Sequence, residues 1–104
     1  MNKDDLWSRN PNVVFRVVAG ERLLVPVRGE AARSRRLYTL NPLGAAVWEI
    51  LDEARSFGSL CEALMIRYPG VSVGRVEEDT SRFLLELESF GLLRRGRETG
   101  AHGV

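Results

Sequence analysis

The spacing of the hydrophobic positions changes at Asn41 and Pro42, and this change divides the chain into two parts. Before it, β-branched and aromatic residues gather in short runs that suit a pleated, half-buried surface. After it, apolar residues recur at helical spacing, which is typical of amphipathic helices. The order predicts an α+β fold in which an N-terminal three-stranded antiparallel β-meander precedes a three-helix bundle, an arrangement similar to a winged helix.

Three short runs before Asn41 carry the strand pattern. They cover residues 13–18, 23–27 and 36–40. A turn around Gly20 joins the first two strands, since glycine reaches positive φ without strain. The polar segment 28–35 shows no periodicity and is expected to form a flexible loop. Residues 1–12 are polar and are expected to form a loose lead-in.

The part of the chain after Asn41 is expected to form three helices. They run over about 42–54, 59–68 and 73–90. Asn41 is a good N-cap for the first helix, and Pro42 suits its first turn, where no N–H is needed. Ser59 and Glu62 match a capping box at the start of the second helix. Gly91 is expected as the C′ residue that ends the third.

Each predicted helix has one apolar face that we expect to pack in a common core. In chain order the faces are Leu43, Val47, Ile50, Leu51 and Ala54; Leu60, Cys61, Leu64, Met65 and Tyr68; and Val76, Thr80, Phe83, Leu84, Leu87 and Phe90. Trp48 lies at the margin of the first face, and we expect both Trp48 and Phe83 to be mostly buried. The glycine-rich segment 95–104 is expected to be a disordered tail.

Composition limits the protein to one small domain in a reducing compartment. The chain has 104 residues, enough for a single core, and a formal net charge of +1, so no global field attracts nucleic acid or an anionic membrane. Cys61 is the single cysteine, which excludes an intramolecular disulfide. No signal peptide and no apolar run near the about 18 residues of a membrane span is evident. We expect a cytoplasmic protein.

No residue pattern indicates catalysis. His102 is the single histidine and lies in the glycine-rich tail, where nothing would fix its tautomer. Cys61 falls on an apolar helix face without a nearby Cys, His or basic residue, which favours a small buried hydrophobe over a nucleophile. Paired-carboxylate, metal-ligand, P-loop and nucleophile-elbow patterns are missing. We therefore expect no enzymatic activity, no metal and no cofactor.

A DNA-binding regulator is the alternative function that the fold class raises, because winged-helix folds bind DNA in some proteins and peptides in others. Its support is two arginine clusters, Arg33, Arg35 and Arg36, and Arg94, Arg95 and Arg97. A solvated loop is the simpler explanation of each cluster. The helix expected over 73–90 carries Glu77, Glu78, Asp79, Glu86 and Glu88 against Arg75 and Arg82. Phosphate repulsion would oppose docking that helix in a groove, so nucleic acid is not the expected partner.

The third predicted strand offers a different kind of site. In a meander of three strands, 36–40 lies at an edge and leaves one row of N–H and C=O groups unpaired. An extended peptide can add to such an edge as a fourth strand, with main-chain bonds for affinity and side-chain pockets for selectivity. The alternative is an edge covered by the protein's own tail or loop.

The segment 37–51, which reads LYTLNPLGAAVWEIL, resembles the PqqD-like family, as do the later segments FLLEL at 83–87 and GLL at 91–93. The resemblance covers about residues 12–94, and its motif is hydrophobic patterning with Asn, Gly, Trp and a final Gly-Leu-Leu. The family includes the small protein of pyrroloquinoline quinone (PQQ) biosynthesis. Its fold recurs as the RiPP recognition element, which captures leader peptides of ribosomal precursor peptides. The arginine-rich segment 28–36 is longer than the family pattern.

The resemblance implies one PqqD-like domain over 13–94 that acts as a non-catalytic peptide chaperone. It would bind a precursor's leader peptide between the third strand and the third helix. It would then present the peptide to a modifying enzyme, often a radical S-adenosylmethionine (SAM) enzyme, which would hold the iron–sulfur chemistry; a homodimer is also possible. The implied peptide-binding residues are Arg36, Leu37, Tyr38, Thr39 and Leu40 on the strand, and Arg75, Asp79, Arg82, Phe83 and Glu86 on the helix.

Overall fold

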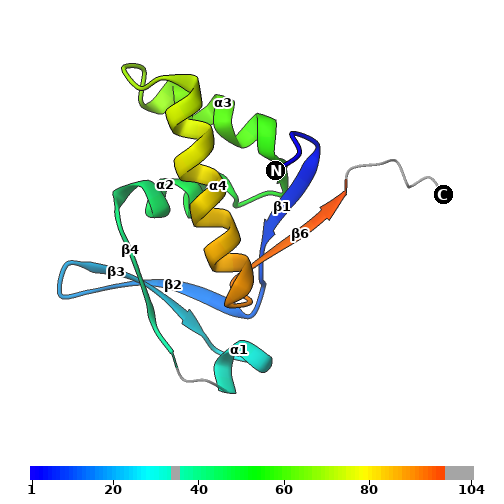
Figure 1. The fold of residues 1–104 in the computed structure, drawn as a ribbon. Coiled ribbons are helices and arrows are strands. Elements are labelled where there is room, and N and C mark those ends of the chain that lie inside the picture. The colour runs from blue at the N-terminus through cyan, green and yellow to red at the C-terminus, as the bar shows by residue number, and fades with distance from the viewer. Residues whose placement is uncertain (34–35, 98–104) are drawn as a thin grey trace.

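The computed structural model describes residues 1–33 and 36–97 and arranges them as two small antiparallel sheets and helices α1 to α4 (Figure 1). The strands are β1 (Asp5–Arg9), β2 (Val13–Val18), β3 (Glu21–Pro26), β4 (Tyr38–Leu40), β5 (Arg55–Ser56) and β6 (Leu93–Arg97). The helices are α1 (Glu30–Arg33), α2 (Pro42–Ile50), α3 (Phe57–Arg67) and α4 (Val73–Ser89). The α+β class is confirmed, and α1 is a short helix within the segment expected to be a loop.

The expected β-meander is present as the sheet β2-β3-β4. β2 and β3 pair from Val13 with Pro26 to Val18 with Glu21, and β4 adds antiparallel to β3. The turn between β2 and β3 consists of Ala19 and Gly20, both with positive φ (52° and 82°), as a two-residue type I′ hairpin turn requires. The third strand is shorter than expected, because it begins at Tyr38.

A second sheet, with the order β5-β1-β6, was not predicted from the sequence. β1 pairs along its whole length with β6, so segments from opposite ends of the described chain lie side by side (Figure 1). The expectation of a loose lead-in over 1–12 is therefore wrong, and Trp7 on β1 is fully buried. The expectation of a disordered tail is wrong for residues 95–97, which belong to β6. The rest of the tail, including His102, lies outside the described residues.

α2 and α3 each begin after an N-cap residue, but the N-cap of α3 is not the residue expected from the sequence. Asn41 caps α2 as predicted, with its Oδ1 accepting from the Gly44 N–H at 2.7 Å. α2 ends at Ile50, so the exposed Ala54 is not on its apolar face. The capping box at Ser59 is wrong: α3 begins at Phe57, and the Ser56 Oγ accepts from the Ser59 N–H at 3.1 Å.

The end of α4 is a Schellman motif that turns the chain directly into β6. Gly91 has φ +77°, and its N–H donates to the Glu88 carbonyl at 3.0 Å. The Leu92 N–H donates to the Leu87 carbonyl at 2.9 Å, and both leucine side chains are buried. The prediction of Gly91 as the C′ residue is confirmed.

A single core joins the helices to both sheets. Its fully buried members include Trp7, Leu24, Leu51, Leu60, Leu64, Leu84 and Leu87. Trp48 is 4% exposed, as expected, and Cys61 is buried, so that burial raises the pKa of its thiol to about 11. Two aromatic residues expected on the inward face of the third helix depart from the prediction: Phe83 on α4 is only partly buried, and Phe90, the C-cap of α4, is 40% exposed.

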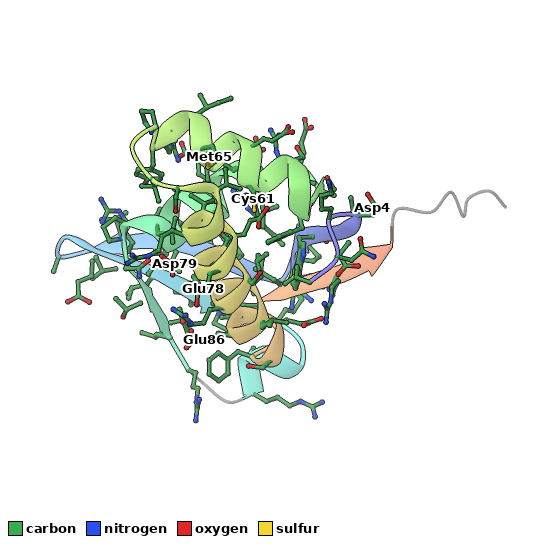
Figure 2. The ribbon with its side chains drawn as sticks, turned by 45° about the horizontal axis from the view of Figure 1, so that its top comes forward. Asp4, Cys61, Met65, Glu78, Asp79 and Glu86 are labelled. Carbon is green, nitrogen blue, oxygen red and sulfur yellow. The ribbon has the colours of Figure 1, made fainter. Side chains whose placement is uncertain are left out.

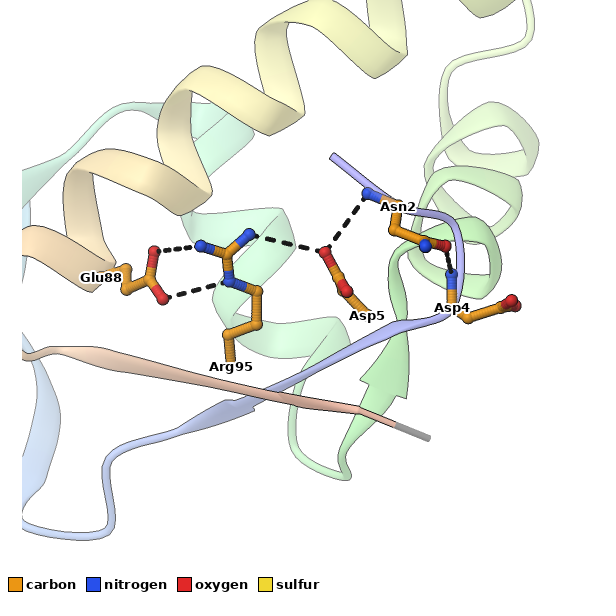
Figure 3. A network of polar contacts seen from close by, with 5 residues as sticks. All are labelled: Asn2, Asp4, Asp5, Glu88 and Arg95. Carbon is orange, nitrogen blue, oxygen red and sulfur yellow. Dashed lines mark hydrogen bonds and ion pairs between the residues drawn. The ribbon is translucent and has the colours of Figure 1, made fainter. Parts of the chain in front are cut away.

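Arg95 on β6 ties the second sheet to α4 (Figure 3). Its Nε and Nη2 donate to the two carboxylate oxygens of Glu88, each at 3.2 Å, and its Nη1 lies 3.5 Å from Asp5 Oδ2 on β1. The same guanidinium lies over the Trp7 ring, 5.2 Å from its centroid. These contacts are partly buried, which makes them less screened by water than an exposed pair.

If β1 is part of the core, truncating Trp7 must leave a large cavity. We expect Trp7→Ala to lower the free energy of unfolding by about 3–5 kcal/mol, as measured by chemical denaturation. Ile66→Ala is the control, because Ile66 on α3 is 82% exposed and its truncation should change stability by less than about 0.5 kcal/mol. Equal unfolding midpoints for Trp7→Ala and the wild type would show that β1 is not an integral strand.

Candidate functional site

β4 has one edge without a strand partner among the residues that the structure describes. It pairs with β3 on one side only, which is the edge expected from the sequence. Figure 1 shows α4 running between β4 and the β1–β6 pair. No described strand covers this edge. The C-terminal tail was one segment that could have covered it, and most of the tail lies outside the described residues.

Two open cavities lie along β4 and meet at Tyr38 and Glu86, which line both. The first, the Asp79 cavity, has a volume of about 420 Å³. It is lined on the β4 and α2 side by Tyr38, Thr39, Asn41 and Leu43, and on the α4 side by Arg75, Asp79, Arg82, Phe83 and Glu86. Asp79 and Glu86 come from successive parts of the same helix (Figure 2).

The second cavity, the Arg36 cavity, is larger, with a volume of about 1010 Å³. Residues of β4 and the segment before it line one side: Arg36, Leu37 and Tyr38. The C-terminal end of α4 and the start of β6 line a second side. The connection before β2, with Asn10 and Asn12, and the connection after β3, with Arg28, complete the lining. The two cavities adjoin at Tyr38 and Glu86, and we call them together the β4–α4 groove.

Charges in the Asp79 cavity are paired within α4. Arg75 Nε lies 3.1 Å from Asp79 Oδ2, and Arg82 lies 3.6 Å from both Asp79 and Glu78. These are exposed pairs at helical spacing, each of small energetic value. Because the arginines and carboxylates balance, the cavity is polar and has little net charge.

An aromatic ring forms the apolar part of the Asp79 cavity. Phe83 projects from α4 onto α2, where a Cβ added to Gly44 would lie 2.7 Å from the Phe83 ring. Gly44 thus allows α2 and the ring to approach closely. Phe83 is partly buried by this contact and keeps part of its surface toward the groove.

Three side chains stack in the Arg36 cavity. The Tyr38 and Phe90 rings have centroids 5.8 Å apart and are tilted by 52°. The Arg36 guanidinium lies over the Phe90 ring, 5.6 Å from its centroid. Such aromatic and cation–π contacts favour a fixed arrangement of the three groups. They explain why Phe90 stays outside the core although its spacing resembles that of a core residue.

Tyr38 lies at the junction of the two cavities and has a perturbed phenol. Burial raises the pKa of Tyr38 to about 12, and the Glu86 carboxylate adds to the shift, because an anion nearby disfavours the phenolate. Tyr38 is therefore a neutral hydrogen-bond donor at physiological pH, aimed at the part of the groove that also holds a carboxylate.

The structure brings together almost all the residues that the family resemblance implied. Arg36 and Leu37 line the Arg36 cavity, and Thr39 and all five helix residues line the Asp79 cavity; Tyr38 and Glu86 line both. Leu40 is the exception, since its side chain is 4% exposed and lies in the core. Their role in peptide binding stays a prediction.

Sequence reasoning missed Phe90, Arg28, Arg94, Asn10 and Asn12 as groove residues. Phe90 was assigned to the core, Arg94 to the end of the domain, and the asparagines to a loose segment. The arginine clusters of the sequence gave the usable signal: Arg94 belongs to one of them, and Arg28 lies in the arginine-rich segment 28–36 that holds the other.

Neither a metal site nor a membrane span is found in the described residues. No group of three or more His, Cys, Asp or Glu side chains in this part of the chain could hold a metal ion. Within the same residues, no helix has the length and apolar character needed to cross a membrane.

The Tyr38 environment predicts a late ionisation that absorbance can follow. The difference between the alkaline titrations of the wild type and Tyr38→Phe should give a phenol pKa about two units above the ordinary value of 10.0. Because the unfolded chain releases this proton first, stability should fall as the pH rises from about 10 to about 12. Glu86→Gln should lower the pKa only in part, since burial is the larger cause. An unshifted Tyr38 would place the ring in solvent.

Two comparisons with known proteins found a match to this chain. The family described as Coenzyme PQQ synthesis protein D (PqqD) has a model that matches residues 23–93. A solved structure, TbiB1 in complex with the TbiA(beta) leader peptide, matches with a TM-score of 0.68 at 23% identity, covering 84% of this chain and 94% of that chain. At this identity the likeness shows a shared fold. No curated protein matches the sequence. The family match extends from within β3 to the first residue of β6, which is more than half of the chain, and the protein therefore belongs to the PqqD family.

Proposed function

We propose that this protein is a non-catalytic chaperone that binds the leader of a ribosomally made precursor peptide in the β4–α4 groove. The proposal rests above all on one observation: the unpaired edge of β4 lies beside a groove with both polar and apolar walls. A peptide that adds to this edge gains main-chain hydrogen bonds without any change in the sheet.

Side chains must supply much of the affinity, because β4 is only three residues long and offers few main-chain partners. Association also costs translational and rotational freedom, which a few hydrogen bonds do not offset. The groove provides Phe83 in one cavity and Phe90 in the other, with Tyr38 between them. Alternate side chains of a bound strand would reach these surfaces, since they point to the same face at every second residue.

The shared fold supports a peptide as the ligand. TbiB1, which has this fold, was solved with a leader peptide. The family model that matches this chain is named for PQQ synthesis. Both agree with a role in PQQ-type or related peptide modification, in which this chain holds the leader and leaves the chemistry to another protein.

The proposed enzyme partner is a radical SAM enzyme. Binding the leader would make the encounter between the enzyme and the core peptide nearly intramolecular, because a tethered substrate has a high effective concentration. Self-association would use a different surface. The outer edge of β2 is unpaired in the described sheet and exposes Phe15, Val17 and Val18, so a homodimer formed there would leave the groove open.

A DNA-binding role has weaker support. The arginines of α4 that would face phosphates, Arg75 and Arg82, are paired with carboxylates of the same helix. An additional acidic residue, Glu86, faces the groove. Duplex DNA would meet repulsion along this helix, although a leader peptide of mixed composition would not.

The direct test is a titration of the ¹⁵N-labelled protein with synthetic leaders of short precursor peptides encoded near its gene. Amide shift changes should concentrate in Tyr38–Leu40 and in α4. Phe83→Ala should weaken the binding about tenfold by removing an aromatic contact at the centre of the groove.

Phe15→Ala is the matched control, because Phe15 is an aromatic residue on β2 that lines neither cavity of the groove. It should leave the affinity unchanged, and circular dichroism should confirm that both variants are folded. Shift changes that follow α3 or β2 and spare β4 would reject the groove. Tight binding to duplex DNA, with an affinity that falls steeply as salt rises, would favour the DNA-binding alternative.

A further inference from the structure

Three arginines that line the Arg36 cavity have no carboxylate partner in the described part of the chain. Arg28 and Arg36 stand before and after α1, and Arg94 is on β6. Arg94 Nη2 lies 3.5 Å from the Asn10 Oδ1, which orients it without neutralising it. By contrast, the α4 arginines of the neighbouring Asp79 cavity are paired with carboxylates.

Opposing charges in the Arg36 cavity are fewer. Glu86 lines it, but at the junction with the other cavity and next to Tyr38. The C-terminus of α4 contributes a partial negative charge. Its last carbonyls accept from the Schellman turn, and the Gly91 carbonyl accepts from Asn10 Nδ2 at 2.8 Å. The balance of these groups leaves the cavity positive.

An apolar surface lies among these charges. Leu37 is 60% exposed and Phe90 is 40% exposed, although both are large hydrophobic residues next to a well-formed core. Buried Leu92 and Leu93 form part of the cavity wall. The cavity is more than twice as large as the Asp79 cavity, so it has room for more than one side chain of a ligand.

The segment between β3 and β4 has the geometry to place two of these charges together. Gly29, with φ +83°, starts the turn into α1, and the Ala32 N–H donates to the Gly29 carbonyl at 3.1 Å. A Cβ on Gly29 would lie 3.4 Å from Asn12 Nδ2, so the turn packs closely against the β1–β2 connection. The chain thus lines this cavity at Arg28, shortly after β3, and again at Arg36, shortly before β4.

We propose that the Arg36 cavity is a subsite for an acidic peptide segment, in which two or more carboxylates flank an aromatic or branched aliphatic side chain. The carboxylates would meet Arg28, Arg36 and Arg94, since guanidinium groups bind carboxylates through paired hydrogen bonds. The apolar side chain would cover Leu37 and Phe90. This inference rests on the proposed function for the peptide nature of the ligand, and it adds the composition of the segment that extends beyond β4.

The experiment begins with a displayed library of random peptides about twelve residues long, selected on the full-length protein. Enriched sequences should carry Asp or Glu next to a large apolar residue. Synthetic copies are then measured by fluorescence anisotropy. Arg28→Gln/Arg36→Gln should weaken their binding at least about tenfold at low salt, and high salt should weaken wild-type binding similarly.

The control variant Arg16→Gln/Arg22→Gln removes the same charge from the β2–β3 hairpin, outside the groove. It should change the affinity less than about twofold. An equal loss in the control would show attraction by net charge alone and overturn the subsite.

The two proposals fail in different ways. Enriched peptides that shift β4 amides but lack acidic residues, or that bind Arg28→Gln/Arg36→Gln with wild-type affinity, would overturn the acidic subsite and leave the β4 edge as the binding site. Enriched peptides that shift only residues outside β4 and α4 would overturn both proposals, as would a selection that yields no binding peptide.

Discussion

The groove depends on the antiparallel pairing of β1 with β6. That pairing buries Trp7 and places Arg95 where it can bind Glu88 and Asp5 together. Because α4 passes through the Schellman turn directly into β6, fixing β6 also fixes the end of α4. The helix is therefore held from the side opposite β4. This leaves the space between α4 and β4 free of the protein's own described strands.

The sequence predicted the elements whose signals are local. The meander, the Asn41 cap of α2, the end of α4 at Gly91 and the burial of Trp48 all follow from short-range patterns. β1 could not be found in this way, because its five residues are mostly polar and its longest pairing is with the other end of the chain. Non-local pairing leaves no periodic mark on a strand so short.

The candidate site was predicted unevenly for a related reason. Family resemblance supplied positions on β4, just before it and on α4, and the structure places all of them but Leu40 along the groove. Phe90 has the helical spacing of a core residue, yet it lies at the C-cap, where the chain turns away and no core element covers it. Arg94 required knowledge of β6, and Asn10 required knowledge of β1, so neither could be placed without the second sheet.

The central claim is that a leader peptide adds to β4 as a fourth strand, and amide hydrogen exchange of β4 tests it most directly. An outward-facing N–H on an unpaired edge exchanges readily with water, whereas a main-chain hydrogen bond to a bound peptide protects it. Our account predicts that a saturating leader slows exchange within Tyr38–Leu40 and leaves the outer edge of β2 unchanged. Unchanged exchange in β4 while the leader is demonstrably bound would contradict it.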